Sequence, residues 1–201
     1  MLSVQRLACV RGERPLFAGV GFTLQPGEWA HVRGANGSGK TSLLRILAGL
    51  SPADEGEVLW NGTPIGEDAE AWRRDMLYLG HHSALKEELT GLENLQFAAQ
   101  LDGCALPYDR ALAALARFGL AGREDLPVRV LSAGQKRRVL LARTVTRPHG
   151  VWILDEPFTA LDARAVDMLT GLVSRHLDGG GMAVITSHQA VPLEGGTVVE
   201  L

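Results

Sequence analysis

The segment GANGSGKT, residues 34–41, constrains the fold of this 201-residue chain more strongly than any other feature. It matches the pattern G-x-x-x-x-G-K-(S/T) at every fixed position, and it lies between the apolar run EWAHV and the segment SLLRILAGL. Apolar residues at 43, 44, 46, 47 and 50 recur with a helical period, so the context is a strand, a glycine loop and a helix. This order predicts a phosphate-binding P-loop. The alternative is a glycine-rich turn that binds nothing.

Each residue type in this loop has a chemical role. The glycines let the backbone wrap and point its N–H groups at a β-phosphate. Lys40 supplies positive charge to the β- and γ-phosphate oxygens, and the Thr41 hydroxyl can hold Mg²⁺. The loop alone does not choose among kinases, GTPases and transport ATPases. The predicted nucleotide-binding residues here are Gly34, Ala35, Asn36, Gly37, Ser38, Gly39, Lys40, Thr41 and Ser42.

An acidic pair follows the short apolar run VWIL, at Asp155 and Glu156. In P-loop enzymes the second protein ligand of the metal is an acid at the end of a buried strand, and Asp155 has that position. Glu156 would then orient or deprotonate a water that attacks the γ-phosphate. The alternative is a solvated acidic pair at a strand end. Nucleotide kinases of similar length usually lack this adjacent pair.

A second helix start lies in LSAGQKRRVLLAR, residues 131–143. Ser132 is predicted as the N-cap, with the amides of Gly134 and Gln135 free in the first turn, and such a turn is an anion site. If this site cannot reach the chain's own nucleotide, a second copy could supply it in trans. Two copies head to tail would then enclose two ATP molecules about a two-fold axis. The alternative for Ser132 is an ordinary helix cap.

The remaining pattern predicts an α/β protein. Residues 1–33 alternate apolar and polar and predict a meander of short antiparallel strands, and residues 51–66 predict a further hairpin. Helical patterns dominate from 69 to 147, with one helix predicted over 111–123. A strand at 151–154, a helix at 165–177 and a second strand at 181–188 then follow one another, and this alternation predicts a parallel sheet.

Composition excludes several classes of function. The net charge of −3 gives no general attraction to nucleic acid, so no nucleic-acid partner is expected. The two cysteines, Cys9 and Cys104, form no C-x-x-C spacing, which favours reduced thiols and a cytoplasmic protein. No signal-peptide pattern and no membrane-spanning apolar run is present in the sequence, so a membrane role is expected to come through a partner.

LSAGQKRR, then ILDEP, then TALD (159–162) together resemble the ATP-binding subunit of an ABC transporter, over essentially the whole chain. The resemblance implies one ABC-type domain over 1–201, with ATP and Mg²⁺ as ligands. Its core would be a P-loop NTPase core, a parallel sheet flanked by helices. An N-terminal antiparallel β-subdomain and an inserted α-helical subdomain at about 83–138 would complete the domain.

The same resemblance assigns roles at the second site. Ser132 and Gly134, with Gln135, would contact the γ-phosphate held by a second copy of the chain, and Asp162 would lie in the D-loop across that dimer. His188, after the buried strand that ends ITSH, would be the switch histidine that contacts the γ-phosphate and helps to position the water. A lone histidine of this kind is more often a structural residue.

Two positions depart from the family pattern. The residue 29 positions before Lys40, where most members place an aromatic that stacks on adenine, is Arg11. A guanidinium can also stack on a base, and Phe17 is an alternative whose position suggests the core. His81 occupies the place of the usual glutamine, where it could reach the Mg²⁺ shell or the water. A metal-binding pair with His82 and a plain loop are the alternatives.

Within the family, YLGHH, LKEELTGLENL and WILDEPFTALD are similar to the ATP-binding subunits of cytochrome c maturation systems. This implies haem handling in c-type cytochrome biogenesis, polytopic membrane subunits as partners, and a peripheral place on the cytoplasmic face of the bacterial inner membrane. Residues 81–94 would line the groove for those partners. The alternatives are another ABC exporter (for lipid, lipoprotein or ions), a soluble non-transport ABC ATPase and a P-loop small-molecule kinase.

Overall fold

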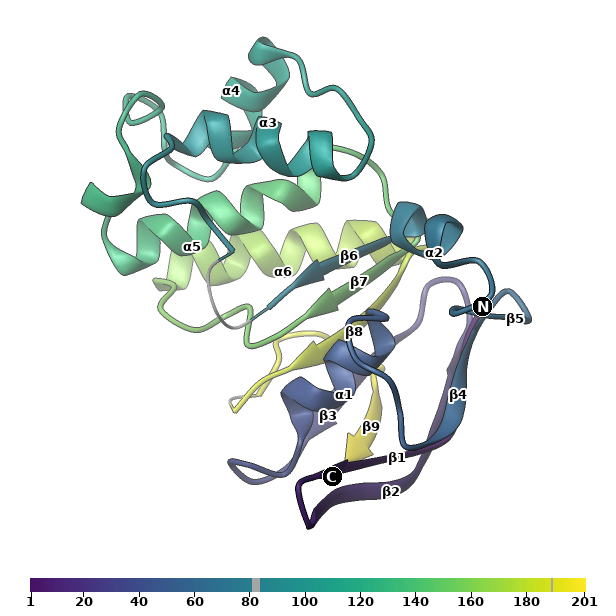
Figure 1. Ribbon diagram of the computed structural model, residues 1–201. Coiled ribbons are helices and arrows are strands. Elements are labelled where there is room, and N and C mark those ends of the chain that lie inside the picture. Colours follow the sequence, from purple (N-terminus) through teal and green to yellow (C-terminus); the bar gives the residue numbers. More distant parts are fainter. Residues whose placement is uncertain (81–83, 189) are drawn as a thin grey trace. The chain divides into compact units, whose positions relative to one another are not determined.

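The computed structural model describes residues 1–80, 84–188 and 190–201. The chain folds as two compact units, each described here by itself. The first unit is discontinuous, since it comprises Met1–His81, His149–Pro157 and Leu169–Leu201. The second unit comprises His82–Pro148 and Phe158–Met168. Figure 1 shows the elements of both.

The first unit contains an antiparallel sheet of four strands in the order β2-β1-β4-β5. These strands are β1 (Leu2–Arg11), β2 (Arg14–Leu24), β4 (Glu55–Trp60) and β5 (Thr63–Pro64). The hairpin predicted within residues 51–66 is confirmed by the β4–β5 pair, in which Trp60 lies opposite Thr63. Gly56 lets β4 approach β1 closely, because a Cβ there would lie 2.2 Å from the Gln5 carbonyl oxygen.

The first unit also contains a parallel sheet of five strands in the order β6-β7-β8-β3-β9 (Figure 1). Its strands are β3 (Trp29–Arg33), β6 (Met76–Leu79), β7 (Val151–Leu154), β8 (Met182–Thr186) and β9 (Thr197–Glu200). The prediction that β3 belongs to the N-terminal meander is wrong. β3 pairs with β8 and β9, because four of its five residues are buried and need a cover on both faces.

Two helices of this unit are α1 (Lys40–Leu47) and α2 (Ala69–Asp75). The apolar stripe of α1 packs against β7 and β8. Trp72 of α2 is buried and donates its indole N–H to the Leu47 carbonyl at 3.0 Å, which fixes the end of α1. One core therefore joins the two sheets and both helices, with members such as Leu7, Leu44 and Val184.

The second unit is helical. It contains α3 (Gly91–Leu101), α4 (Tyr108–Arg117), the short 3₁₀ turns Val128–Val130 and Arg143–Val145, and α5 (Ala133–Ala142). The last long helix, α6 (Ala163–Asp178), begins here and passes into the first unit at Leu169. The single helix predicted over 111–123 is wrong at its end. α4 stops at Arg117 because Gly119 adopts a left-handed conformation, with φ of 70°, that ends the helix.

No helix in the part of the chain that the structure describes is long and apolar enough to cross a membrane.

Candidate functional site

The predicted P-loop forms the turn between β3 and α1. Ala35, Asn36 and Gly37 are exposed at its tip. α1 begins after Gly39, whose φ of 106° only glycine adopts readily, and no side chain caps the helix. A Cβ at Gly39 would lie 2.9 Å from the Phe17 ring. The uncapped first turn therefore leaves backbone N–H groups for an anion.

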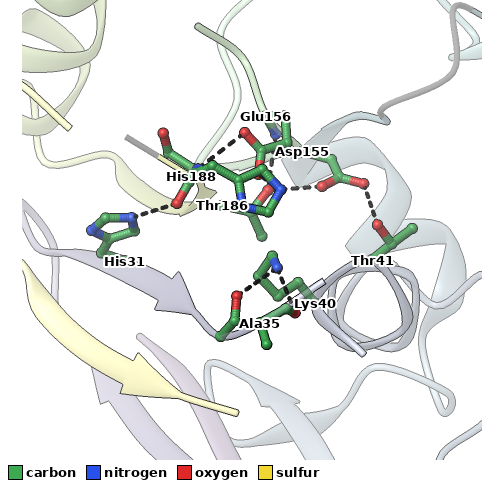
Figure 2. Close-up of polar contacts among 10 residues, drawn as sticks. His31, Ala35, Lys40, Thr41, Asp155, Glu156, Thr186 and His188 are labelled. Carbon is green, nitrogen blue, oxygen red and sulfur yellow. Dashed lines mark hydrogen bonds and ion pairs between the residues drawn. The ribbon is translucent and has the colours of Figure 1, made fainter. Parts of the chain in front are cut away.

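Lys40 is folded back onto this loop. Its ammonium group donates to the carbonyl oxygens of Gly34 at 2.8 Å and Ala35 at 3.0 Å (Figure 2). An ammonium has three donors, so these two bonds orient Lys40 and leave one donor for a ligand. The Ser38 hydroxyl is also buried, and it has no hydrogen-bond partner among the described residues. A cradle with an uncapped helix, a held cation and an orphaned hydroxyl fits a phosphate group.

Asp155 links the P-loop helix to the end of the parallel sheet. Its Oδ2 accepts from the Thr41 hydroxyl at 2.9 Å, and its Oδ1 accepts from the Thr186 hydroxyl at 2.7 Å (Figure 2). Residues 41 and 155 are thus brought together by the fold. Burial raises the pKa of the Tyr78 phenol, and the negative charge of Asp155 raises it further, so Tyr78 stays neutral. The paired hydroxyl and carboxylate are oxygen donors of the kind that Mg²⁺ prefers.

Glu156 lies against His188. The Glu156 backbone N–H donates to the Thr186 hydroxyl at 2.9 Å, and its φ of 51° is left-handed. The His188 backbone N–H lies 3.3 Å from Oε2 of Glu156, and the His188 Nε2 lies 3.3 Å from Oε1 (Figure 2). The carboxylate is nearly buried, whereas the imidazole is half exposed. The carboxylate is held twice by His188, on a backbone in a left-handed conformation. Such a carboxylate beside an accessible histidine suits proton transfer at the surface of the first unit.

Thr186 was missed in the sequence analysis, although it holds Asp155 and Glu156 at once. It is fully buried at the end of β8. The signal was a hydroxyl at the end of an otherwise apolar strand, two residues before the predicted histidine. His31 on β3 was missed in the same way, since it is buried inside an apolar strand. Burial, the largest cause, lowers the pKa of His31.

The second unit holds Ser132 and its neighbours. Ser132 caps α5 as predicted: its hydroxyl accepts from the Gln135 N–H at 3.2 Å, and the Gln135 side chain accepts from the Ser132 N–H at 2.9 Å. The prediction of a free Gln135 amide is therefore wrong, because this reciprocal capping box satisfies it. The Ser132 hydroxyl still has its own O–H to donate.

Gly134 and Asp162 belong to the same part of this unit. A Cβ at Gly134 would lie 3.1 Å from the carbonyl oxygen of Ala160, a residue with φ of 62°. Asp162 caps α6 by accepting from the Ala165 N–H at 2.8 Å, and its other oxygen pairs with Arg138 of α5. The segment TALD is therefore packed on the helix that follows LSAGQ.

The positions that depart from the family pattern, with the alternatives considered for them, lie in different parts of the chain. Arg11 is exposed at the end of β1, opposite Arg14, and its stacking on adenine stays a prediction. Phe17 lies in the core, as its position suggested. His81 and His82 lie outside the described residues. No group of three potential metal-ligating side chains occurs within the ranges 1–80, 84–188 and 190–201.

The sequence of this chain is similar to those of known proteins. Residues 17–159 match the family described as ABC transporter. Over 100% of its length, the chain is 56% identical to "Cytochrome c biogenesis ATP-binding export protein CcmA" of Dechloromonas aromatica (strain RCB), and covers 98% of that protein. It is 49% identical to the protein of the same name from Nitrosomonas europaea, over 100% of this chain and 94% of that one.

Among solved structures, a dimeric ATP-binding cassette in a post-hydrolysis state bound to ADP and Pi has a TM-score of 0.83. It is 24% identical to this chain, and the match covers 94% of this chain and 88% of that structure's chain. This likeness confirms the predicted fold class, a parallel sheet flanked by helices with an antiparallel β-sheet. The family match and the full-length relatives go further: the chain belongs to the ABC transporter family of ATPases.

Proposed function

We propose that this chain is the ATP-hydrolysing subunit of a membrane ABC complex that couples ATP binding and hydrolysis to haem handling in c-type cytochrome biogenesis. The observation that carries the proposal is the 56% identity, over the whole chain, to a protein named for ATP-binding export in cytochrome c biogenesis. The cradle around Lys40 and the pair of Glu156 with His188 supply the chemistry that such a subunit needs.

ATP would bind with its phosphates on the uncapped first turn of α1. Lys40, already oriented by two loop carbonyls, would neutralise the β- and γ-phosphate oxygens, and Ser38 would donate its hydroxyl. Thr41 and Asp155 would hold Mg²⁺, which supplies further neutralisation of phosphate charge when bound. Arg11 is proposed to stack on the adenine ring of ATP. His81 is proposed to reach the Mg²⁺ shell or the attacking water.

Glu156 would be the general base. A water would attack the γ-phosphorus, the bond from that phosphorus to the bridging oxygen of ADP would break, and the water's proton would pass to the Glu156 carboxylate. His188 would hold this carboxylate and contact the γ-phosphate. Its Nε2 is 3.3 Å from Oε1, which is close enough to orient the carboxylate before the substrate arrives.

The second anion-binding turn would act on a second copy of the chain. Ser132 has an O–H donor left after capping α5, and Gly134 adds a backbone N–H in the same turn. We infer that these groups, with Gln135 orienting Ser132 and Asp162 holding α5, contact the γ-phosphate bound by the partner copy. Ser132→Arg should then spare ATP binding and block hydrolysis at the opposite site, so unimpaired turnover would remove the trans assignment.

The complex would sit at the cytoplasmic face of the bacterial inner membrane, and polytopic membrane subunits would hold this chain there. The chain is proposed to be one ABC-type domain with an inserted helical subdomain at about 83–138. Residues 81–94 are proposed to face the membrane subunits.

A complementation experiment tests the proposal. A bacterium that lacks its own cytochrome c maturation ATPase should regain haem-stained c-type cytochromes when it produces this chain. Lys40→Ala should fail, because the phosphate cradle loses its cation, whereas Arg73→Ala, a change to an exposed cation of α2, should succeed. If the chain hydrolysed ATP in that strain with its membrane subunits present and no c-type cytochrome formed, the haem assignment would be wrong. Another export substrate would then be indicated.

A further inference from the structure

Strand β3 carries three side chains that alternate along it, at Trp29, His31 and Arg33, and therefore point to one face of the sheet. This strand leads directly into the P-loop. Trp29 donates its indole N–H to the Glu194 carbonyl at 2.8 Å, and its ring stacks on that of His31 at a centroid separation of 6.0 Å. A buried histidine in this row has no role in the phosphate chemistry described above.

The hydrogen bonds of His31 fix its tautomer. Arg33 donates from Nε to Nδ1 of His31 at 3.0 Å, and a guanidinium can only donate, so Nδ1 is the unprotonated acceptor. The proton of the neutral ring is then on Nε2. This atom lies 3.4 Å from the carbonyl oxygen of Ser187, to which it donates (Figure 2).

Ser187 is nearly buried and directly precedes His188. The His188 backbone N–H and ring both face the Glu156 carboxylate, at 3.3 Å each. A continuous series of contacts therefore runs from Arg33 through His31 and the Ser187 carbonyl to the histidine that meets Glu156. Every member belongs to the first unit.

We propose that His31 is a positioning residue for ATP hydrolysis: by holding the Ser187 carbonyl, it fixes the backbone from which His188 reaches Glu156. The inference rests on the proposed function, because it assumes that Glu156 and His188 act in hydrolysis. It assigns no contact between His31 and ATP. The expected signature is therefore a change in kcat without a change in ATP affinity.

The neutral ring is required for this role. Protonation would place a hydrogen on Nδ1, which would break the bond from Arg33 and set two cations side by side. Burial and the Arg33 charge lower the pKa of His31, while the Ser187 carbonyl, Glu200 and Glu156 oppose them. His188 is the titratable residue that directly follows Ser187, and Glu194 accepts from Trp29 through its backbone carbonyl. The net direction is downward, so the Arg33–His31–Ser187 arrangement persists at neutral pH.

The test compares substitutions at two positions in the full chain. His31→Leu places an apolar side chain in the buried position and removes the donor, so kcat should fall about tenfold while the Kd for ATP stays unchanged, since a misplacement far from the chemistry acts on the rate. His31→Gln retains an N–H donor near the position of Nε2 and should recover kcat to within about threefold of the parent. Arg33→Met, at an exposed position, should lower kcat less than His31→Leu, and Arg73→Met is the matched control.

Parental kcat in His31→Leu would overturn the inference. So would equal loss in His31→Gln and His31→Leu, or a weakened Kd that accounts for the loss. If His31→Leu failed to fold, Arg33→Met would decide: a lowered kcat at unchanged Kd supports the role, and a parental kcat refutes it. Glu156→Gln tests the assumption beneath the inference, because parental turnover in that variant would refute Glu156 as the base whatever the rate of His31→Leu.

Discussion

Thr186→Val is the perturbation that tests the architecture of the site most sharply. The two side chains have nearly the same shape, so the change removes a hydroxyl from a fully buried position without opening a cavity. That hydroxyl donates to Asp155 Oδ1 at 2.7 Å and accepts from the Glu156 N–H at 2.9 Å. One of these bonds reaches a carboxylate, and both lie in the buried end of β8.

The expected loss of stability follows from the two bonds. The bond to the carboxylate contributes about 2 kcal/mol and the bond from the amide about 1 kcal/mol, so the free energy of unfolding should fall by about 3 kcal/mol. For a chain of this size that corresponds to a Tm lower by about 9 °C. Circular dichroism on heating measures the shift, and a coupled phosphate-release assay should show a lower kcat because Glu156 loses its backbone anchor.

Thr186→Ser is the control, since it keeps the hydroxyl and should retain most of the stability and rate. The reasoning would be refuted if Thr186→Val melted with the parent and hydrolysed ATP at the parental rate. That result would mean that the carboxylate pair is held by other groups.

Three further predictions follow from single sites. Asn94 is buried and bonds one N–H and three carbonyls of the turn that leads into α3, so Asn94→Ala should lower the free energy of unfolding by about 2–4 kcal/mol in urea titration; a parental midpoint would contradict this. His176 stacks on Trp152 at 4.0 Å, and burial lowers its pKa below the usual 6.5. The unfolded chain therefore takes up the proton first, so the parent should lose stability as the pH falls below 6.5, and His176→Phe should lose less over that range. Equal pH slopes for the two proteins would count against this assignment. Gly39→Ala should abolish nucleotide binding in a filter assay, because its Cβ would lie 2.9 Å from the Phe17 ring; normal binding would show that the loop can move aside.

The parts of the site that could be predicted were those with a local signature. Strand, glycine loop and helix occur in sequence around Lys40, and an apolar strand ends in Asp155 and Glu156, so spacing alone located both. The cap at Ser132 was equally local. The backbone amide of Gln135 was wrongly predicted to be free, because a serine at an N-cap accepts from the N–H three residues on, which here is that of Gln135.

What could not be predicted depends on partners distant in the chain. β3 follows the alternating strands of residues 1–33 and resembles one more strand of that meander. Its neighbours β8 and β9 lie far later in the chain, and only their pairing shows that β3 is internal to the parallel sheet. Thr186 and His31 look like single polar interruptions of apolar strands. Their roles arise from residues 30 and 156 positions away, to which no sequence period points.

The most direct measurement of the central claim is single-turnover hydrolysis by Glu156→Gln, with ATP binding measured on the same preparation. The substitution keeps the size of the side chain and removes the base, so we predict a Kd for ATP like that of the parent, a hydrolysis rate lower by at least about 100-fold, and an ATP-bound dimer that persists. Hydrolysis at the parental rate would contradict the assignment of Glu156 as the base and, with it, the mechanism derived from this site.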